Sequence, residues 1–369
     1  MLKRLYIDNY RCLVNFECRF DAKQLIVGPN GSGKTTVFDV LNLLRDFCVY
    51  GMPVDPWFVG LSRTRWQDVP TQTFELEVEA NEGEYVFRLV VDSWGQPARP
   101  RVMTEEVRHS GKPVFRFTNG EVQLFNDRYE ATVKYPFDWH RSALATITER
   151  QENTKLTWFK RWLGGLWFIS PDPHQMSPLA EREAPSPTKN LSNFASWYRH
   201  LRQESDDQEL LADLREVIPG CQSLDLKEAG MGNRILMLSF AESAQNGQFQ
   251  NLYNFRELSD GQRLLVGLYT LLHFATKPGM SLFLDEPDNF IALAEIEPWL
   301  DKLIDRVDET GAQIVIISHH PELLNRMGFQ GGLVLDRPDR RHTRVRPFTD
   351  VGETGLSPAE IVARGWVHE

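Results

Sequence analysis

Hydrophobic and polar positions alternate with two different periods along this chain. In the segment 33–47 the apolar residues recur at helical spacing and share one face. From Thr73 the period changes to two, and apolar residues alternate with glutamates over 74–79. The same alternation returns in the ranges 85–91, 101–107, 114–117 and 122–125. The first period predicts a helix, and the second predicts an antiparallel sheet.

The remaining pattern predicts an α/β fold around this sheet. Further strands are expected at 2–9, 14–20, 24–27 and 166–169, a hairpin at 224–228 with 234–240, and helices at 153–163, 191–202 and 208–217. The last third alternates helix and strand, as a parallel sheet requires. We therefore expect a mixed or parallel core, an inserted antiparallel β-subdomain and a helical subdomain.

Composition narrows the class of protein. The 369 residues are 41% hydrophobic and 25% charged, which is typical of a globular protein with a sizeable core. The net charge of -10 argues against nonspecific nucleic-acid binding by overall charge, although a local basic patch formed on dimerisation is compatible with it. The four cysteines form no CxxC pair and are expected to be buried thiols. No apolar run approaches the roughly 20 residues of a membrane span, and no signal peptide is evident, so we expect a cytoplasmic protein without a membrane partner.

The segment 28–35 reads GPNGSGKT and fits the phosphate-loop pattern GxxxxGK[ST], between a predicted strand and a predicted helix. Glycines let the backbone N–H groups surround phosphates, and the helix start favours negative charge. Lys34 is expected to contact the β and γ phosphates of ATP, and the Thr35 hydroxyl is expected to ligate Mg²⁺. The alternative is an ordinary glycine-rich turn before a helix. The predicted nucleotide-binding residues are Gly28, Asn30, Gly31, Ser32, Gly33, Lys34, Thr35 and Thr36.

A second motif, SLFLDEP at 281–287, is an apolar strand that ends in two carboxylates. A buried strand of this kind presents acids at its carboxyl end, where α/β proteins bind ligands. Asp285 is expected to hold Mg²⁺, directly or through water, and Glu286 is expected to polarise the attacking water as general base. The alternative is a strand-end pair without catalytic function.

The segment 258–262 reads LSDGQ and opens a long amphipathic helix. Taken alone, Ser259 or Asp260 would cap this helix and Gly261 would relax the turn. The segment differs by one residue from the LSGGQ signature of ABC ATPases, however, and the chain therefore resembles that family. The resemblance implies that Ser259 and Gly261 bind the γ-phosphate held by a second copy, at a helix start that favours anions.

Further segments are similar to ABC-ATPase elements. His319 follows the apolar strand 314–317 and resembles the family's switch histidine, with His320 as the alternative and a structural histidine as another. The segment 289–293 lies where the family's D-loop crosses the dimer interface. Gln175 is the candidate for the family's Gln-containing loop, and a solvent-facing loop glutamine is the alternative.

The N-terminal segment 7–13, IDNYRCL, is similar to the opening of the RecF, RecN, SMC and OLD group. That resemblance implies that Arg11 contacts the nucleotide, whereas the residues alone also allow a surface arginine between two strands. The implied architecture is one P-loop ABC-ATPase head. We expect its parts to be an N-terminal lobe at 1–72, an insertion at 73–165, a helical and β lobe at 166–260 and a C-terminal lobe at 261–369.

The resemblance implies a function as well as a fold. It predicts an ATP hydrolase that forms a homodimer across two ATP molecules and acts with a separate effector, such as a nuclease or toxin, in bacterial DNA repair or anti-phage defence. Neither a coiled-coil arm nor a TOPRIM nuclease segment is expected. Two alternatives are a non-hydrolysing ATP sensor, against which Glu286 argues, and the motor subunit of a membrane transporter.

Overall fold

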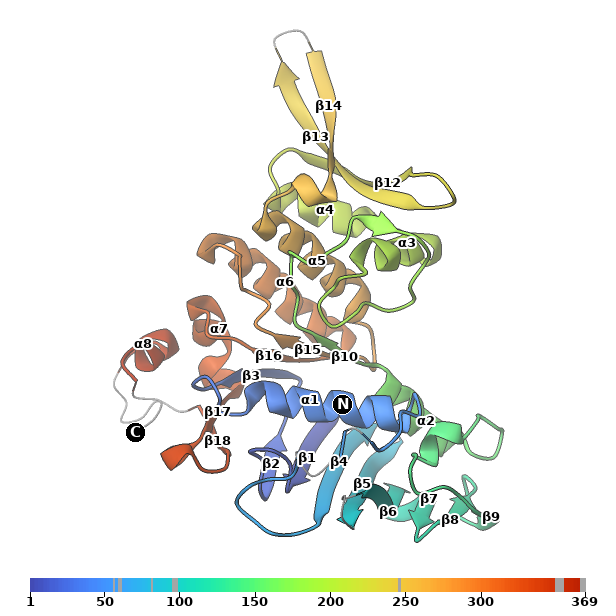
Figure 1. Ribbon diagram of the computed structural model, residues 1–369. Helices are drawn as coiled ribbons and strands as arrows, with labels where there is room; N and C mark the ends of the chain where they lie inside the picture. Colours follow the sequence, from blue (N-terminus) through green and yellow to red (C-terminus); the bar gives the residue numbers. More distant parts are fainter. Residues whose placement is uncertain are drawn as a thin grey trace. The chain divides into compact units, whose positions relative to one another are not determined.

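The computed structural model describes residues 1–55, 57–58, 62–80, 82–94, 99–244, 247–348 and 355–365 (Figure 1). These residues form two compact units. Unit 1 comprises residues 1–166, 279–281 and 327–369, and unit 2 comprises residues 167–278 and 282–326. Residues 56 and 59–61, in the loop that follows the first predicted helix, lie outside the described residues.

Unit 1 contains an eight-stranded sheet in the order β2-β1-β4-β5-β6-β7-β8-β9, in which every neighbouring pair is antiparallel. Its strands are β1 Leu2–Asp8, β2 Phe16–Arg19, β4 Thr71–Ala80, β5 Gly83–Trp94, β6 Arg99–His109, β7 Lys112–Thr118, β8 Glu121–Phe125 and β9 Ala131–Pro136. The N-terminal strands β1 and β2 thus share a sheet with the inserted strands. The sequence pattern alone does not give this pairing.

The alternation along β4 explains how this sheet is stabilised. Phe74, Leu76 and Val78 are completely buried on one face. On the other face Arg4 of β1 makes ion pairs with Glu75 at 3.3 Å and Glu77 at 3.0 Å. The period-two pattern therefore separates an apolar core from a charged outer face.

A smaller group of strands in unit 1 positions the phosphate loop. Strand β3 Lys23–Val27 pairs in parallel with β17 Gly332–Asp336, and β17 pairs antiparallel with β18 Arg344–Pro347. Helix α1 Lys34–Cys48 follows β3 through the loop at 28–33. The other helical elements of unit 1 are η2 Leu144–Thr146, α2 Thr154–Gly164, η4 Pro338–Arg340 and α8 Pro358–Ala363.

Unit 2 combines two groups of strands with a set of helices. Strands β10 Leu166–Ile169, β15 Ser281–Asp285 and β16 Gln313–Ile317 lie side by side in that order. The second group is β11 Leu179–Ala180, β12 Cys221–Glu228, β13 Arg234–Ala244 and β14 Gly247–Asn254, with β13 paired to the other three. The helical elements are α3 Phe194–Glu204, α4 Gln208–Val217, η3 Phe255–Glu257, α5 Asp260–Ala275, α6 Leu293–Thr310 and α7 Pro321–Gly331, the last of which continues into unit 1.

The predicted elements are present in this fold, with ends shifted by a few residues. Strands β9 and β14 were not predicted. Strand β9, ATVKYP, is short and mostly exposed, and β14, GQFQNLYN, lacks a regular apolar alternation. Among the described residues, no helix combines the length and the apolar character that crossing a bilayer demands.

Candidate nucleotide site

The phosphate loop of unit 1 adopts a conformation that depends on its glycines. Gly28, Gly31 and Gly33 have φ angles of 147°, 79° and 103°, a region that side chains with a Cβ rarely adopt. A Cβ on Gly28 would also collide with the carbonyl oxygen of Leu335, and one on Gly33 would lie 2.7 Å from the Thr343 hydroxyl. The chain that runs from β17 to β18 therefore packs closely against one side of the loop.

The start of α1 has the properties of an anion site. Gly33 is its N-cap, and no described side chain caps the helix or places an acid in its first turn. Ser32 is 1% exposed, and its Oγ has no hydrogen-bond partner among the described residues. Lys34 lies over the loop and donates to the carbonyl oxygens of Gly28 at 2.5 Å and Pro29 at 3.2 Å. Uncapped N–H groups, an orphaned hydroxyl and a lysine fit the phosphates of a nucleotide.

The other predicted nucleotide-binding residues of the phosphate loop and of α1 are accessible or partly accessible. Asn30, Gly31 and Thr35 are exposed, and Thr36 is half-buried on α1. An exposed hydroxyl at the position of Thr35 fits the Mg²⁺ ligand that the motif predicts.

Arg11 lies in a tight turn that contacts both α1 and the loop after it. Its φ is 48°, its guanidinium donates to Asp39 of α1 at 3.0 Å, and its side chain is 48% exposed. Its N–H donates to the carbonyl oxygen of Ser62 at 2.7 Å. Arg11 therefore shares a unit with the phosphate loop, one turn of α1 beyond Thr35.

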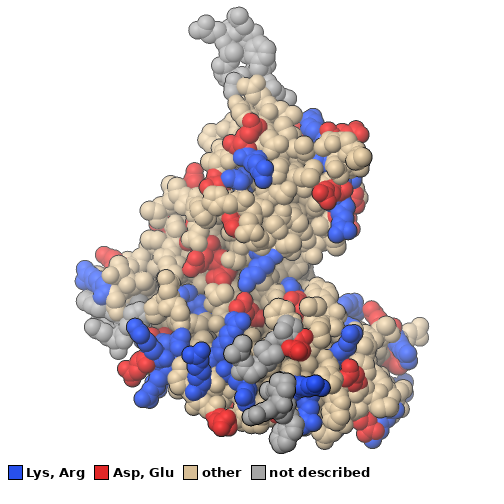
Figure 2. Space-filling model, viewed as in Figure 1, with Lys and Arg blue, Asp and Glu red and all other residues tan. Residues whose placement is uncertain are grey.

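Sequence reasoning missed the support that the segment 337–343 gives to this loop. Arg337 donates to the carbonyl oxygen of Gly31 at 2.9 Å, and Thr343 donates to that of Ser32 at 2.7 Å. The Arg337 guanidinium also lies over the ring of Trp66, at 5.4 Å. Basic side chains gather over this part of unit 1, around β17 and β18 (Figure 2). No local signal reveals contacts between residues about 300 positions apart.

The signature segment of unit 2 is both a helix cap and an exposed helix start. The Ser259 hydroxyl accepts from the N–H of Gln262 at 3.2 Å, and the Gln262 side chain accepts from the N–H of Ser259 at 3.1 Å. Ser259 is exposed. The backbone at position 261 does not require a glycine, because its φ is not in the left-handed region. A Cβ at this position would, however, lie 3.0 Å from the carbonyl oxygen of Phe290. Gly261 thus allows the segment 289–293 to approach α5 closely.

The loop that holds Gln175 packs against the same helix start. The Gln175 side chain donates to Asp172 at 2.6 Å and accepts from Asn190 at 2.5 Å. In this loop Pro173 offers its carbonyl oxygen to Arg263 at 2.7 Å, and His174 lies 3.6 Å from the carboxylate of Asp260. The exposed Gln175 is therefore held near the signature by its own loop.

The two acids follow the fully buried strand β15. Asp285 is 9% exposed, whereas Glu286 is half-buried with a φ of 49°. The Glu286 N–H donates to the carbonyl oxygen of Ile317 at the end of β16, at 2.8 Å. Its carboxylate accepts from the Asn289 side chain at 2.9 Å. A tight turn therefore directs Glu286 away from the strand while Asp285 remains in the core.

The two histidines after β16 have different surroundings. His320 is half-buried, and its Nδ1 accepts from the N–H of Glu322 at 3.2 Å at the start of α7. His319 is exposed. Near them, burial raises the pKa of Asp288, and one of its carboxylate oxygens is buried without a hydrogen-bond partner among the described residues. His320 therefore has a structural role at the start of α7.

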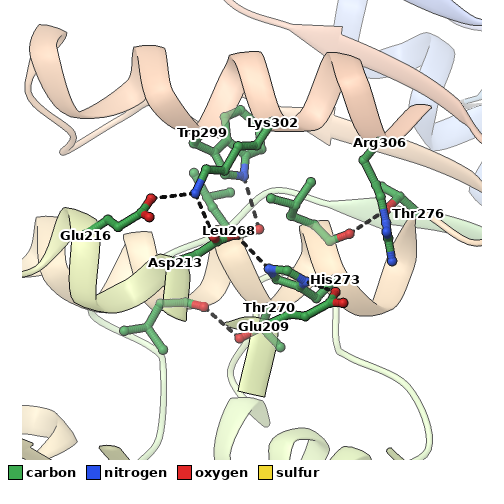
Figure 3. Close-up of polar contacts among 12 residues, drawn as sticks. Glu209, Asp213, Glu216, Leu268, Thr270, His273, Thr276, Trp299, Lys302 and Arg306 are labelled. Atoms are coloured by element: carbon green, nitrogen blue, oxygen red, sulfur yellow. Dashed lines mark hydrogen bonds and ion pairs between the residues drawn. The ribbon is translucent and has the colours of Figure 1, made fainter. Parts of the chain in front are cut away.

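A charged network fixes the helices that carry these segments (Figure 3). Lys302 of α6 donates to Asp213 at 2.6 Å and Glu216 at 2.7 Å, both on α4. His273 of α5 lies 2.8 Å from Asp213. The indole of Trp299 on α6 donates to a carbonyl oxygen of α5. Since α5 starts at the signature and α6 follows the acids, the network links the helices that carry both segments.

Two family matches cover the parts of the chain that contain these motifs. Residues 1–76 match the family described as "AAA ATPase domain". Residues 171–325 match "AAA domain, putative AbiEii toxin, Type IV TA system". Both matches concern AAA-type ATPases.

Individual known proteins also resemble this chain in sequence or in fold. A stretch of 44 residues is 46% identical to the OLD nuclease of Thermus scotoductus, which is 12% of this chain and 8% of that protein. The chain thus matches a small part of that relative's length. The SmcHead bound to the C-winged helix domain of ScpA has a TM-score of 0.55 at 13% identity, and covers 94% of this chain and 98% of its own. The Smc head domain with an extended coiled coil, bound to the C-terminal domain of ScpA derived from Pyrococcus furiosus, has a TM-score of 0.54 at 12% identity, and covers 100% of this chain and 99% of its own.

At such identities the structural likeness concerns the fold, which is that of an SMC head. The family matches add the ATPase type. Together with the phosphate loop, these two partial matches support an ATP hydrolase, and the chain resembles the RecF, SMC and OLD group.

Proposed function

We propose that two copies of this chain close on two ATP molecules and that hydrolysis reopens the dimer. Each ATP would be held by the phosphate loop of one copy and by the Ser259 helix start of the other. The observation that carries this proposal is the exposed, capped start of α5, a kind of helix terminus that favours anions and that is remote in sequence from the phosphate loop.

Asp260 is the departure from the ABC-ATPase signature, and its charge would oppose a phosphate at this position. Two contacts support the proposal despite that charge. Arg263 makes an ion pair with Asp260, and His174 lies 3.6 Å from the same carboxylate. The pairing with Arg263 offsets the negative charge beside Ser259.

Exposed apolar side chains beside the signature support a protein interface there. Phe290 is 54% exposed and Leu293 is 57% exposed, and the carbonyl oxygen of Phe290 approaches Gly261. Large apolar residues of this kind are often found in interfaces between proteins. The segment 289–293 would therefore contact the second copy when the dimer closes.

The individual residues would have distinct tasks in this dimer. Glu286 would take the proton of the attacking water, and His319 would sense the γ-phosphate. Thr35 and Asp285 would hold Mg²⁺, which neutralises phosphate charge when bound. Arg11 would contact the nucleotide near α1. Gln175 would respond to the bound nucleotide as part of the loop at 172–175.

The dimer would gate a separate effector, such as a nuclease or toxin, in bacterial DNA repair or anti-phage defence. Two similarities support this part of the proposal. One relative is named a nuclease, and one matching family is described as a putative toxin of a toxin–antitoxin system. The opening and closing of the dimer would change the surface that this effector contacts.

Light scattering with Glu286→Gln tests the proposal. This variant keeps the shape of the side chain but loses the general base, so ATP with Mg²⁺ should trap a particle of twice the 42.6 kDa chain mass. Lys34→Ala in the same background is the control and should remain a single chain. A Glu286→Gln protein that binds ATP and stays at the mass of one chain would overturn the dimer.

A further inference from the structure

The turn between β17 and β18 is a basic segment in an acidic protein. Residues 337–346 contain five arginines and one aspartate, a net charge of +4, whereas the whole chain carries -10. Arg340, Arg341 and Arg344 are exposed, and none of them has an acidic partner among the described residues. We call residues 337–346 the basic turn.

The basic turn is held rigidly against the phosphate loop. The guanidinium of Arg337 donates to the carbonyl oxygens of Arg341 at 2.8 Å, Arg340 at 3.2 Å and Gly31 at 2.9 Å. Asp339 and Arg340 have left-handed φ angles of 54° and 57°, so the chain reverses sharply here. The exposed arginines are therefore presented beside the exposed edge of the phosphate loop.

An acidic segment of opposite charge lies beside the signature in unit 2. Residues 286–297 contain four acids and no lysine or arginine, a net charge of -4. Glu295 and Glu297 on the first turns of α6 are exposed and make no ion pair among the described residues. The same segment includes Phe290, whose carbonyl oxygen approaches Gly261 at the signature. We call residues 286–297 the acidic segment.

We propose that the basic turn of one copy binds the acidic segment of a second copy and so guides the closing of the dimer. This inference rests on the proposed function, in which the phosphate loop of one copy faces the signature of the other. The basic turn is hydrogen-bonded to the phosphate loop, and the acidic segment packs against the signature. Closing of the dimer would therefore bring the opposite charges of the two copies together. Two chains of charge -10 repel each other at long range, and a local pairing of +4 with -4 offsets that repulsion at the interface.

Charge reversal tests the pairing in the Glu286→Gln background with ATP. Arg340→Glu with Arg341→Glu should weaken dimerisation by roughly tenfold or more, because the net charge of the basic turn falls from +4 to 0 and its attraction to the acidic segment is lost. The matched control is Arg128→Glu with Arg141→Glu, since both arginines are exposed, are far from the turn in sequence and change the net charge equally. The control should dimerise as the parent does, and each variant should bind ATP and melt as the parent does.

Mixing provides the rescue. Glu297→Arg should also weaken dimerisation when present alone, by placing like charges together. In a mixture with the Arg340→Glu, Arg341→Glu protein, one interface of the mixed dimer keeps the unmodified pairing and the other places the introduced acids opposite the introduced arginine, so dimerisation should return in part. Absence of this rescue, or a basic-turn variant that dimerises like its control, would overturn the inference. If the parent Glu286→Gln protein itself fails to dimerise, the proposed function fails instead.

Discussion

The two halves of the proposed nucleotide site are held in place by different means. The phosphate loop of unit 1 depends on residues about 300 positions away, where Leu335, Arg337 and Thr343 contact it. The signature of unit 2 is fixed by its own neighbours, since Ser259 and Gln262 cap the helix that they open. A local cap survives as long as its helix does, whereas the phosphate loop requires a complete unit 1. The first half-site should therefore be the more sensitive to changes in tertiary packing.

The substitution Gly28→Ala tests the long-range support of the phosphate loop most directly. A Cβ at φ 147° would collide with the carbonyl oxygen of Leu335, so we expect unfolding to become easier by about 3–5 kcal/mol. Gly31→Ala is the matched control, because nothing lies within 4 Å of its Cβ and only the φ of 79° is unfavourable. Urea unfolding measures both. Equal losses for the two variants would show that the contact with β17 does not matter.

A buried carboxyl group provides a second test of long-range contacts in unit 1. Glu105 of β6 is completely buried and accepts from the Ser142 hydroxyl and from the N–H of Ala143. Burial raises the pKa of Glu105 to about 7 from 4.5, although these hydrogen bonds oppose the shift. Because the folded state binds this proton more tightly, its contribution to stability is complete below about pH 4.5 and is lost as the pH rises to about 7.

The expected loss from Glu105 is about 3 kcal/mol between those pH values. Glu105→Gln keeps the side-chain shape and removes the titration, so its unfolding free energy should vary less between pH 5 and pH 8 than that of the unmodified chain. Parallel urea titrations over this range provide the measurement. An identical pH slope in the two proteins would refute the assignment.

Substitutions in the signature segment, which is held by local contacts, should lower the free energy of unfolding by less. Ser259→Ala removes a helix cap and should lower the free energy of unfolding by about 1 kcal/mol. Its effect on ATP-dependent dimerisation in the Glu286→Gln background should be clearly larger, because the same hydroxyl would bind the γ-phosphate. Thermal melting and light scattering on one preparation separate the two effects. A loss of stability without a loss of dimerisation would leave Ser259 with the role of a cap alone.

The same contrast explains which features could be predicted from the sequence. The GPNGSGKT loop, the paired acids and LSDGQ are local patterns, and their helices and strands lie where expected. The pairing of β1 with β4 and the contacts of Arg337 and Thr343 depend on register and on distant residues, which leave no periodic signal. Gly261 was interpreted as relaxing a turn, but the structure shows that it admits the carbonyl oxygen of Phe290. Asp288 and its raised pKa were missed, because burial after a turn cannot be seen in a single sequence.

Mixing two inactive variants tests the composite site most directly. Lys34→Ala disables the phosphate loop and Ser259→Arg blocks the signature, so neither protein alone should hydrolyse ATP. A mixed dimer holds one intact site, formed by Lys34 of one copy and Ser259 of the other. Because neither variant should close with itself, the mixed dimer should dominate and restore at most half of the unmodified turnover, since it carries one of two sites. Phosphate release that stays at the level of the separate variants, although both proteins are folded and mixed dimers form, would contradict the account.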